Sequence, residues 1–307
     1  MDNRTYIIIV TFNAMPWLKS CLDTCKGYSV IIVDNASTDQ TVTFVKKQYP
    51  AVKLLKQETN LGFGQGNNVG ISYALNQGAE SVLLLNQDAY LMDDCLNRLI
   101  DIQKSKPEYA ILSPVHLNGE GNLLDRNFSL YMRFDSNPDF YSDFVLNKPK
   151  QVVYEVPFVN AAGWLLSKQC LESVGGFDPI FFHYGEDDNY CQRVHYHGLK
   201  IGVVPTAFLK HDREHREVIK PEKNSAAFFE RWERSKKMKY ADINNTEALI
   251  LLDNEIKQLE RSVLKLKLKF RFATAASLNR QLRLLQKIKV EVKSSRELNV
   301  KKGRHYI

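Results

Sequence analysis

The segment Val82-Leu83-Leu84-Leu85-Asn86-Gln87-Asp88 joins a continuous apolar run to a short polar stretch that ends in a carboxylate. An apolar run of this length is typical of a strand covered on both faces, as in a parallel sheet. The carboxyl ends of such strands form the edge at which open α/β folds bind ligands. Asp88 is therefore expected at a binding edge, although a lone aspartate after a strand also caps helices often.

Short apolar runs alternate with amphipathic stretches before this segment. Strands are predicted at Ile7–Val10, Val30–Val33, Val52–Leu55 and Ser81–Leu85. Helices are predicted at Pro16–Cys25, from Ser37 or Thr38 through Val45, and at Gly66–Leu75. This order predicts an α/β fold with a doubly wound, mostly parallel sheet flanked by helices. Residues 107–160 are rich in Asn, Pro, Asp and aromatic residues and yield no assignment.

Charge divides the chain of 307 residues unevenly. Residues 250–307 hold 15 Lys/Arg and 5 Asp/Glu, a net charge of about +10. Because the net charge of the whole chain is +7, the remaining residues carry a net charge of about −3. We expect a catalytic domain over residues 1–220 and a basic helical extension over residues 221–307. No run approaches the roughly 18 apolar residues of a membrane span, and the five cysteines lack paired spacing, so a cytoplasmic protein with reduced thiols is predicted.

The C-terminal extension carries two apolar seams of helical spacing. The first consists of Leu249, Leu252, Ile256, Leu259, Val263, Leu266 and Phe270, and the second of Leu278, Leu282, Leu285 and Ile288 or Val292. Spacings of three and four residues predict coiled-coil-like helices that fold back as a hairpin or pair in a homo-oligomer. The intervening lysines and arginines offer an alternative, contact with the anionic inner face of the cell membrane. No aromatic interleaving supports nucleic-acid binding.

Three further motifs follow predicted strands or open predicted helices. Asp34 ends the second strand, where its carboxylate could accept the imide N–H of a uracil or thymine ring or could cap the next helix. The glycine-rich run 60–70 departs from the dinucleotide pattern Gly-x-Gly-x-x-Gly, since Val69 takes the final position, so a nicotinamide site is rejected. Glu186-Asp187-Asp188 opens a predicted helix, whose dipole favours ionised carboxylates. His211 becomes a candidate ligand only if it approaches Asp88.

In this order the motifs resemble inverting glycosyltransferase family 2, and most closely its bacterial rhamnosyltransferase-like members. The resemblance covers roughly residues 5–212. It is carried by Val10-Thr11-Phe12-Asn13, Val33-Asp34-Asn35-Ala36-Ser37-Thr38-Asp39, the glycine-rich run, Asn86-Gln87-Asp88, Gly175-Gly176-Phe177-Asp178, Gly185-Glu186-Asp187-Asp188 and His211. It implies a GT-A fold and a requirement for Mg²⁺ or Mn²⁺.

The resemblance also implies roles for individual residues. The nucleotide sugar would be held by Thr11, Asn13, Asp34, Asn35, Gly66, Asn67, Gln87, Asp88 and Trp164, with the indole beneath the sugar. Asp88 would bind the metal, with His211 as a second contact. Asp187 would be the base and Glu186 an acceptor contact. Because residue 189 is Asn where the family often has Asp, the base assignment stays open between Asp187 and Asp188.

The sequence therefore predicts a metal-dependent inverting glycosyltransferase. It would move a sugar, rhamnose being one candidate, from a dTDP- or UDP-linked donor to a hydroxyl of a bacterial surface glycan or lipid-linked glycan. One alternative is a nucleotidyltransferase, which would need a basic glycine-rich loop after the first strand, where Thr11-Phe12-Asn13-Ala14 stands. The other is a catalytically silent subunit that binds nucleotide sugars.

Overall fold

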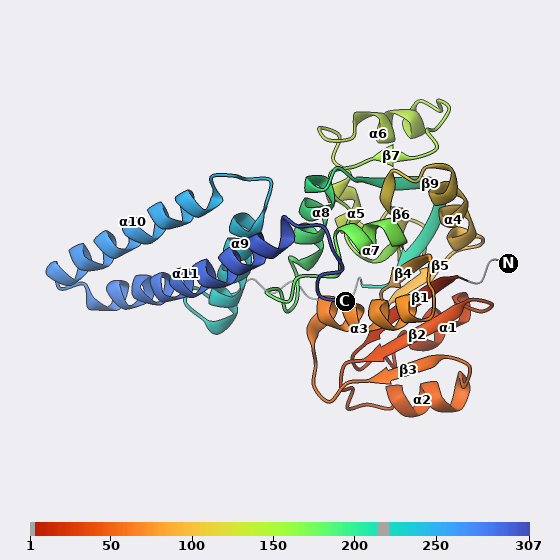
Figure 1. Cartoon of the computed structure of the whole chain (residues 1–307), viewed down its shortest axis with the longest axis horizontal. Helices are drawn as coiled ribbons and strands as arrows, with labels where there is room; N and C mark the ends of the chain where they lie inside the picture. Colours follow the sequence, from red (N-terminus) through yellow and green to blue (C-terminus); the bar gives the residue numbers. More distant parts are fainter. Residues whose placement is uncertain (1–3, 214–220) are drawn as a thin grey trace.

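The computed structural model describes residues 4–213 and 221–307. In this part of the chain a nine-stranded sheet carries helices on both faces, and three long helices extend from one side of it (Figure 1). The strands are β1 (Thr5–Thr11), β2 (Ser29–Asp34), β3 (Lys53–Lys56), β4 (Ser81–Leu85), β5 (Ala89–Leu91), β6 (Tyr109–Asn118), β7 (Tyr154–Glu155), β8 (Gly163–Ser167) and β9 (Lys200–His211). The expected α/β class is confirmed.

The sheet has the order β3-β2-β1-β4-β8-β6-β9-β5, with β7 paired to β9. The four strands predicted from the sequence form its parallel half, β3-β2-β1-β4. In the other half, β8 runs antiparallel to both β4 and β6, whereas β6 and β9 are parallel. The carboxyl ends of β1, β2 and β4 therefore lie at one edge of the sheet.

Helices cover both faces of the parallel half. The helices of the whole sheet domain are α1 (Leu18–Thr24), α2 (Thr41–Gln48), α3 (Gly62–Asn76), α4 (Cys95–Ser105), α5 (Arg126–Tyr131), α6 (Pro138–Val145), α7 (Lys168–Ser173) and α8 (Glu186–Tyr196). Along β1, Ile8 packs in one core with Ile71 of α3, and Ile7 and Ile9 pack in a second core with Leu18 of α1. Burial on both faces explains why these strands are continuous apolar runs.

Helix α3 begins at Gly62, four residues earlier than the prediction of Gly66, so most of the glycine-rich run is helical. Glycine lowers helix propensity, but here it permits close packing against the sheet. A Cβ atom at Gly70 would lie 2.4 Å from Cγ2 of Ile8, and one at Gly66 would lie 2.8 Å from Cγ1 of Val10. The glycines thus bring α3 against β1.

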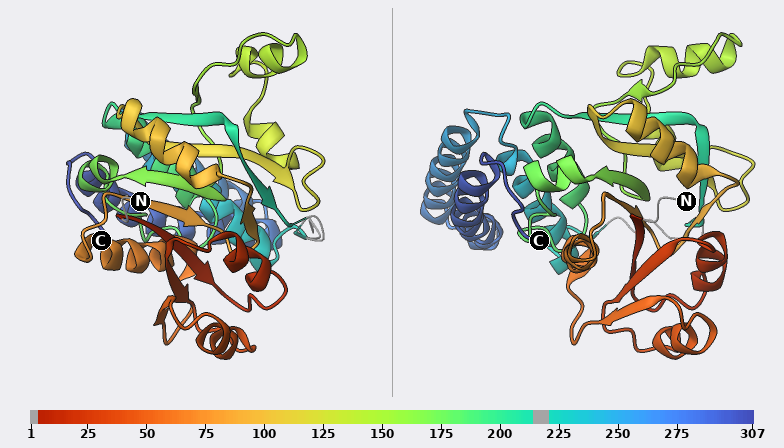
Figure 2. Two further views of the ribbon diagram at one scale, coloured as in Figure 1. Left: turned by 90° about the vertical axis from the view of Figure 1, so that its right-hand side faces the viewer. Right: turned by 45° about the vertical axis from the view of Figure 1, so that its right-hand side comes forward.

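The region 107–160, left unassigned from the sequence, supplies β6, α5, α6 and β7. The apolar strand β6 contains Pro114, and its register with β9 shifts between Pro114 and Val115. Proline lacks the N–H that a regular ladder needs, so an irregularity at this position is expected. Helix α6 stands apart from the body of the sheet in both views of Figure 2, whereas β7 pairs with β9.

The C-terminal extension consists of α9 (Ala226–Ala241), α10 (Ala248–Leu268) and α11 (Phe272–Asn299). Helices α10 and α11 form a hairpin whose predicted seams meet in a core that includes Leu252, Ile256, Leu285 and Ile288. Of the two arrangements that the seams allowed, the fold-back hairpin is therefore present within one chain. Phe270 is not part of the seam: it lies in the turn of the hairpin and is 80% exposed.

The end of the chain packs on the Gly175–Asp178 motif of the sheet domain. The Gly176 amide donates to the carbonyl oxygen of His305 at 2.8 Å. The buried Asp178 carboxylate accepts from Oγ of Ser295 at 2.6 Å and from Nδ2 of Asn299 at 2.7 Å. The expected domain boundary after residue 220 lies at the end of residues 214–220, outside the described residues. The extension nevertheless makes specific contacts with the sheet domain.

Among the described residues, none of the helices combines the length and apolar character needed to cross a bilayer.

Candidate active site

The loops after β1 and β2 are tied together at the sheet edge. The Asn13 backbone, at φ 50°, donates its N–H to Oγ of Ser37 at 3.0 Å, and the Asn13 side-chain oxygen accepts from the Thr38 amide at 2.9 Å. From the neighbouring strand β4, Oε1 of Gln87 accepts from the Phe12 amide at 2.8 Å. Thr11, Asn13 and Gln87, three predicted binding residues, are thereby brought to one edge.

Asp34 is buried at the end of β2 and does not cap helix α2. Its carboxylate accepts from Oγ1 of Thr11 at 3.2 Å and from the Ser37 amide at 3.1 Å. The N-cap residue of α2 is Gln40. Of the two roles considered for Asp34, helix capping is therefore ruled out, and the carboxylate closes the turn that shapes this edge.

The predicted contacts in the glycine-rich run lie beside this turn. Nδ2 of Asn35 donates to the Gly62 carbonyl at 2.9 Å, while its Oδ1 is buried without a hydrogen-bond partner in the described part of the chain. Asn67 is buried one turn into α3, and its amide nitrogen donates to the Phe63 carbonyl at 3.0 Å. Gly66 lies against Asn35, with its ideal Cβ position 3.2 Å from Nδ2.

Asp88 and His211 converge, as a shared metal role requires. Oδ1 of Asp88 lies 3.5 Å from Nε2 of His211, and both side chains are about 2% exposed. Asp88 directly precedes β5, which pairs with β9 so that Ala89 faces His211. Nδ1 of His211 is buried and lacks a hydrogen-bond partner among the described residues. A carboxylate oxygen and an imidazole nitrogen thus face one another in a dry setting.

Across residues 4–213 and 221–307, no group of three or more His, Cys, Asp or Glu side chains is arranged to hold a metal ion on its own. Mg²⁺ is usually bound through one or two carboxylates together with substrate phosphates. The Asp88–His211 pair, with Nε2 of the imidazole toward the carboxylate, therefore fits a cation whose remaining ligands come from a diphosphate.

The acidic motif forms the first turn of α8, after Gly185 in the left-handed conformation at φ 89°. Burial raises the pKa of Asp187, and interactions with the backbone of Asp188 and Ala161 offset part of that rise. Burial, reinforced by the charge of Asp187, also raises the pKa of Glu186, and it raises that of Asp188 to about 7. Three adjacent carboxyl groups with raised pKa values are typical of acid–base sites.

The segment 160–162 connects the two acidic motifs. The Asn86 amide donates to the carbonyl oxygen of Ala162 at 3.0 Å, and the backbone of the adjacent Ala161 is near enough to the Asp187 carboxylate to lower its pKa. The motif that ends in Asp88 and the one that contains Asp187 therefore flank the same three residues, which lead into β8. This arrangement brings together motifs that lie about a hundred residues apart in the chain.

Arg213 was not identified from the sequence, yet it binds Asp125 and acts on the charge of Asp187. Its guanidinium binds the Asp125 carboxylate through two hydrogen bonds, at 2.6 and 3.0 Å. Its positive charge also favours the ionised form of Asp187 and so acts to lower the pKa of that group. The only sequence signal was its position two residues after His211, because Asp125 belongs to the region left unassigned.

Trp164 lies in the core of the sheet domain. The indole is fully buried, stacks on Phe177 at a ring distance of 6.3 Å and packs against Tyr190. Its Nε1 has no hydrogen-bond partner in the described structure. The indole thus packs against two aromatic rings in the core, whereas the resemblance implied a position beneath the sugar.

A cavity of about 250 Å³ lies at the opposite edge of the sheet, lined by Thr5 and Ser81 at the starts of their strands and by Ser167. None of the predicted site residues lines it. We assign the site to the other edge, because ligands of α/β folds bind at the carboxyl ends of parallel strands.

Comparison with known proteins decides the family. The sequence profile described as Glycosyl transferase family 2 matches residues 6–174, more than half of the chain. The chain belongs to glycosyltransferase family 2. The structure of GalNAc-T7 with UDP, GalNAc and Mn²⁺ has the same fold, with a TM-score of 0.57 at 16% identity over 77% of this chain and 50% of that one. The GT-A architecture is thereby confirmed.

Curated relatives of this family 2 chain are distant. An N-acetylglucosaminyl-diphospho-decaprenol L-rhamnosyltransferase of Mycobacterium tuberculosis is 26% identical over 72% of this chain and 80% of its own length. A low-salt glycan biosynthesis hexosyltransferase, Agl10 of Haloferax volcanii, is 26% identical over 64% of this chain. The match spans 63% of the haloarchaeal protein, less than two thirds of its length.

The raised pKa values in the first turn of α8 predict how sugar transfer by this family 2 chain depends on pH. A base is active only when ionised, so the rate should fall as the pH is lowered through the raised pKa of Asp187. Because the pKa of Glu186 is raised in part by the charge of Asp187, the two carboxylates repel each other. The variant Glu186→Gln should therefore shift the acidic limb of the kcat/KM profile to lower pH. An unchanged limb would remove Asp187 from the role of base.

The same groups predict the pH dependence of stability. The folded-state pKa of Asp188, about 7, exceeds its ordinary value of 3.8, so over this range the folded chain binds a proton that the unfolded chain has released. The free energy of unfolding should then decrease as the pH rises from about 4 to 7. Urea denaturation of Asp188→Asn should show a flatter dependence than the parent chain, and an equal slope in both would contradict the prediction.

Proposed function

We propose that this chain is a metal-dependent inverting glycosyltransferase. It would move a sugar from a nucleoside diphosphate donor to a hydroxyl of a bacterial surface-glycan acceptor. The single observation that supports the proposal is that segment 160–162 contacts both acidic motifs: Ala162 accepts a hydrogen bond from the Asn86 amide, and the backbone of Ala161 lowers the pKa of Asp187. The Asp88 carboxylate faces an imidazole, and that of Asp187 heads a helix among acidic neighbours, so the two are suited to different tasks.

The donor would bind across the carboxyl ends of β1, β2 and β4. Asp34 and Asn35 would contact the base and ribose, since the turn after β2 fixes their side chains through hydrogen bonds to Ser37 and Gly62. Asp88 and His211 would hold Mg²⁺ or Mn²⁺ on the diphosphate. The bound cation would neutralise the charge that develops on the leaving diphosphate.

Asp187 would act as the base. It accepts the proton of the acceptor hydroxyl while that oxygen attacks the anomeric carbon from the side opposite the diphosphate. The bond between the anomeric carbon and the diphosphate oxygen breaks, and its electron pair leaves with the diphosphate. A single displacement inverts the configuration, and positioning of the two substrates supplies much of the rate. Buried Glu186, next to the base, would contact the acceptor.

Two relatives support the choice of substrates. The name of the mycobacterial relative contains both L-rhamnosyl transfer and a diphospho-decaprenol acceptor, and a dTDP-rhamnosyl transferase, RfbF of Shigella flexneri, is 24% identical over 69% of this chain. We infer a dTDP-linked deoxyhexose, in particular rhamnose, as the donor. The acceptor would be a glycan on a lipid diphosphate.

Thermal unfolding with nucleotide sugars and Mn²⁺ tests the donor. A ligand at about one hundred times its dissociation constant stabilises a folded protein by about 2.7 kcal/mol. We expect dTDP-rhamnose to raise the unfolding midpoint more than UDP-glucose or UDP-N-acetylglucosamine does. Greater stabilisation by UDP sugars would overturn the rhamnosyl assignment, and no stabilisation by any of them would overturn the transferase assignment.

Slow hydrolysis of the donor separates the alternatives. A catalytically silent subunit would bind the donor and release no free sugar, whereas a transferase without acceptor passes the sugar to water at a low rate. A nucleotidyltransferase would release pyrophosphate from dTTP and a sugar phosphate.

A homo-oligomer is also proposed, although the apolar seams that suggested it are covered within one chain.

A further inference from the structure

The turn between α10 and α11 combines exposed apolar side chains with a high density of positive charge. Four large apolar residues at the end of the hairpin are mostly exposed: Leu264 at 60%, Leu268 at 72%, Phe270 at 80% and Phe272 at 62%. Residues 257–272 contain six Lys/Arg and one acidic residue, Glu260. In Figure 1 this turn is the end of the hairpin farthest from the sheet. We call residues 257–272 the hairpin tip.

The basic and apolar residues of the hairpin tip share one face of α10. At about 100° per residue, Lys257, Arg261, Leu264, Lys265 and Leu268 fall within about 100° of the helix circumference. The seam residues Ile256 and Val263, which pack against α11, lie on the opposite side. This face is therefore open to solvent while the seam is covered.

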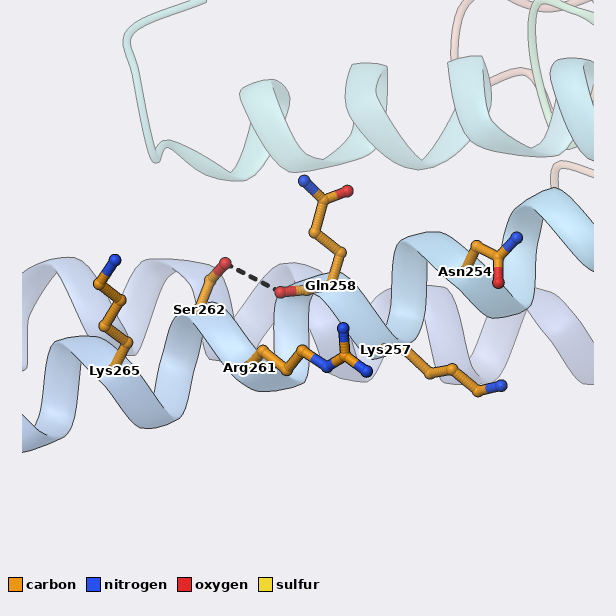
Figure 3. Close-up of a pocket in the computed structure, with 6 residues that line it drawn as sticks. All are labelled: Asn254, Lys257, Gln258, Arg261, Ser262 and Lys265. Carbon is orange, nitrogen blue, oxygen red and sulfur yellow. Dashed lines mark hydrogen bonds between the residues drawn. The ribbon is translucent and has the colours of Figure 1, made fainter.

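Figure 3 shows the polar part of this face, with α11 behind α10. A shallow depression of about 470 Å³ is lined by Asn254, Lys257, Gln258, Arg261, Ser262 and Lys265. Three of these side chains are cationic, and no carboxylate lines the depression. The Ser262 hydroxyl donates to the Gln258 carbonyl at 2.8 Å. The depression suits anionic groups.

We propose that the hairpin tip docks on an anionic lipid surface. The side chains of Leu264, Leu268, Phe270 and Phe272 would enter the interface, and the surrounding lysines and arginines would contact phosphate headgroups. The two phenyl rings lie edge to face at 6.0 Å and form one apolar projection. Both features of the tip, its charge and its apolar projection, match such a surface.

Two other occupants fit less well. A second copy of the chain would bring the same excess of positive charge to the contact, and like charges repel. A nucleic acid would satisfy the cations, but Leu264 and Leu268 would gain nothing from a phosphate backbone. The lipid surface is also independent of the proposed function, because docking requires neither donor nor acceptor.

Co-sedimentation of the full chain with vesicles tests the proposal. One set of vesicles contains phosphatidylcholine alone, and the other contains phosphatidylcholine and phosphatidylglycerol in equal amounts. We expect binding to the second set and much weaker binding to the first. Lys265→Gln with Lys269→Gln should lower the partition coefficient about thirtyfold, at about 1 kcal/mol for each basic residue. Phe270→Ser with Phe272→Ser, which keeps every charge, should lower it at least about tenfold.

Matched variants control for general effects. Val290→Ser removes an apolar side chain that is 69% exposed on α11, about 27 Å along the helix from Phe272. Lys46→Gln with Lys47→Gln removes two exposed charges from α2, at the far side of the molecule in Figure 1. Both controls should leave partitioning unchanged.

Several results would overturn the proposal. They are equal binding to both vesicle sets, no binding to either, and equal losses in the tip and control variants. A loss on lysine replacement alone, with a single-stranded oligonucleotide bound equally well, would make the hairpin tip a general polyanion site. Since the replaced residues are exposed, the thermal unfolding midpoints of all variants should match that of the parent chain, which shows that each variant folds. Failure of docking would leave donor binding and hydrolysis unaffected.

Discussion

Asp187→Asn should lower the rate of sugar transfer by about 10²–10⁴-fold, the usual contribution of a general base. The amide has nearly the same shape as the carboxylate, and its oxygen can still accept the N–H of Asp188. It cannot accept the proton of the attacking hydroxyl. Because Asp187 is placed on the acceptor side of the site, donor affinity should remain within about twofold of the parent value.

The matched control is Asp188→Asn, which removes the same charge one residue further along α8. The side chain of Asp188 starts about 100° around the helix from that of Asp187, so only one of the two can point at a given hydroxyl. Transfer kinetics and isothermal titration with the nucleotide should be measured for both variants. A larger loss in Asp188→Asn would move the role of base to that residue. Equal losses of rate and donor affinity in Asp187→Asn would remove Asp187 from proton transfer.

Asp88→Asn should abolish most of the effect of metal on nucleotide binding. For the parent chain we expect Mn²⁺ to increase the affinity for a nucleoside diphosphate, because the cation joins the diphosphate to Asp88 and His211. The amide is a weaker ligand than the carboxylate, so the affinity gained on adding Mn²⁺ should shrink at least about tenfold. Titrations with and without Mn²⁺ measure this ratio directly.

Asp212→Asn provides the control for Asp88. Asp212 follows His211, its amide donates to the Asp88 carbonyl at 2.8 Å, and its carboxylate accepts from the Tyr90 hydroxyl at 2.9 Å. It is thus a second carboxylate next to the paired strands β5 and β9. If Asp212→Asn removes the metal effect and Asp88→Asn does not, the metal role of Asp88 is wrong. Neither variant should change nucleotide affinity in the absence of metal by more than about twofold.

The parallel half of the fold could be predicted because its signals are local. Each of β1, β2 and β4 is a short apolar run, and helices separate the strands from β1 to β4 along the chain, so periodicity and order sufficed. The apolar seams of α10 and α11 could also be predicted, since spacings of three and four residues mark the buried face of a helix. The helix α3 was placed four residues late because its glycines resemble a loop. Only contact with Val10 and Ile8 shows why glycine is needed there.

The second half of the sheet could not be predicted. Strand β6 contains Pro114, which argues against a central strand, and its irregular pairing with β9 involves residues far apart in the chain. Strand β8 inserts antiparallel between β4 and β6, an arrangement that no local pattern specifies. For the same reason the ion pair between Arg213 and Asp125 was not predicted, since the two residues are 88 positions apart in the chain.

The sequence alone determined the chemical groups at the site and the strand ends on which they stand, because those depend on residue type and short-range periodicity. Their convergence was decided by the tertiary structure. Asp88 meets His211 because β5 pairs with β9, and segment 160–162 contacts both the Asn86–Asp88 motif and the first turn of α8. The fold also decided that the apolar seams close on each other and leave the tip exposed. Contacts between distant segments depend on how sheets and helices pack, so they cannot be predicted from periodicity along the chain.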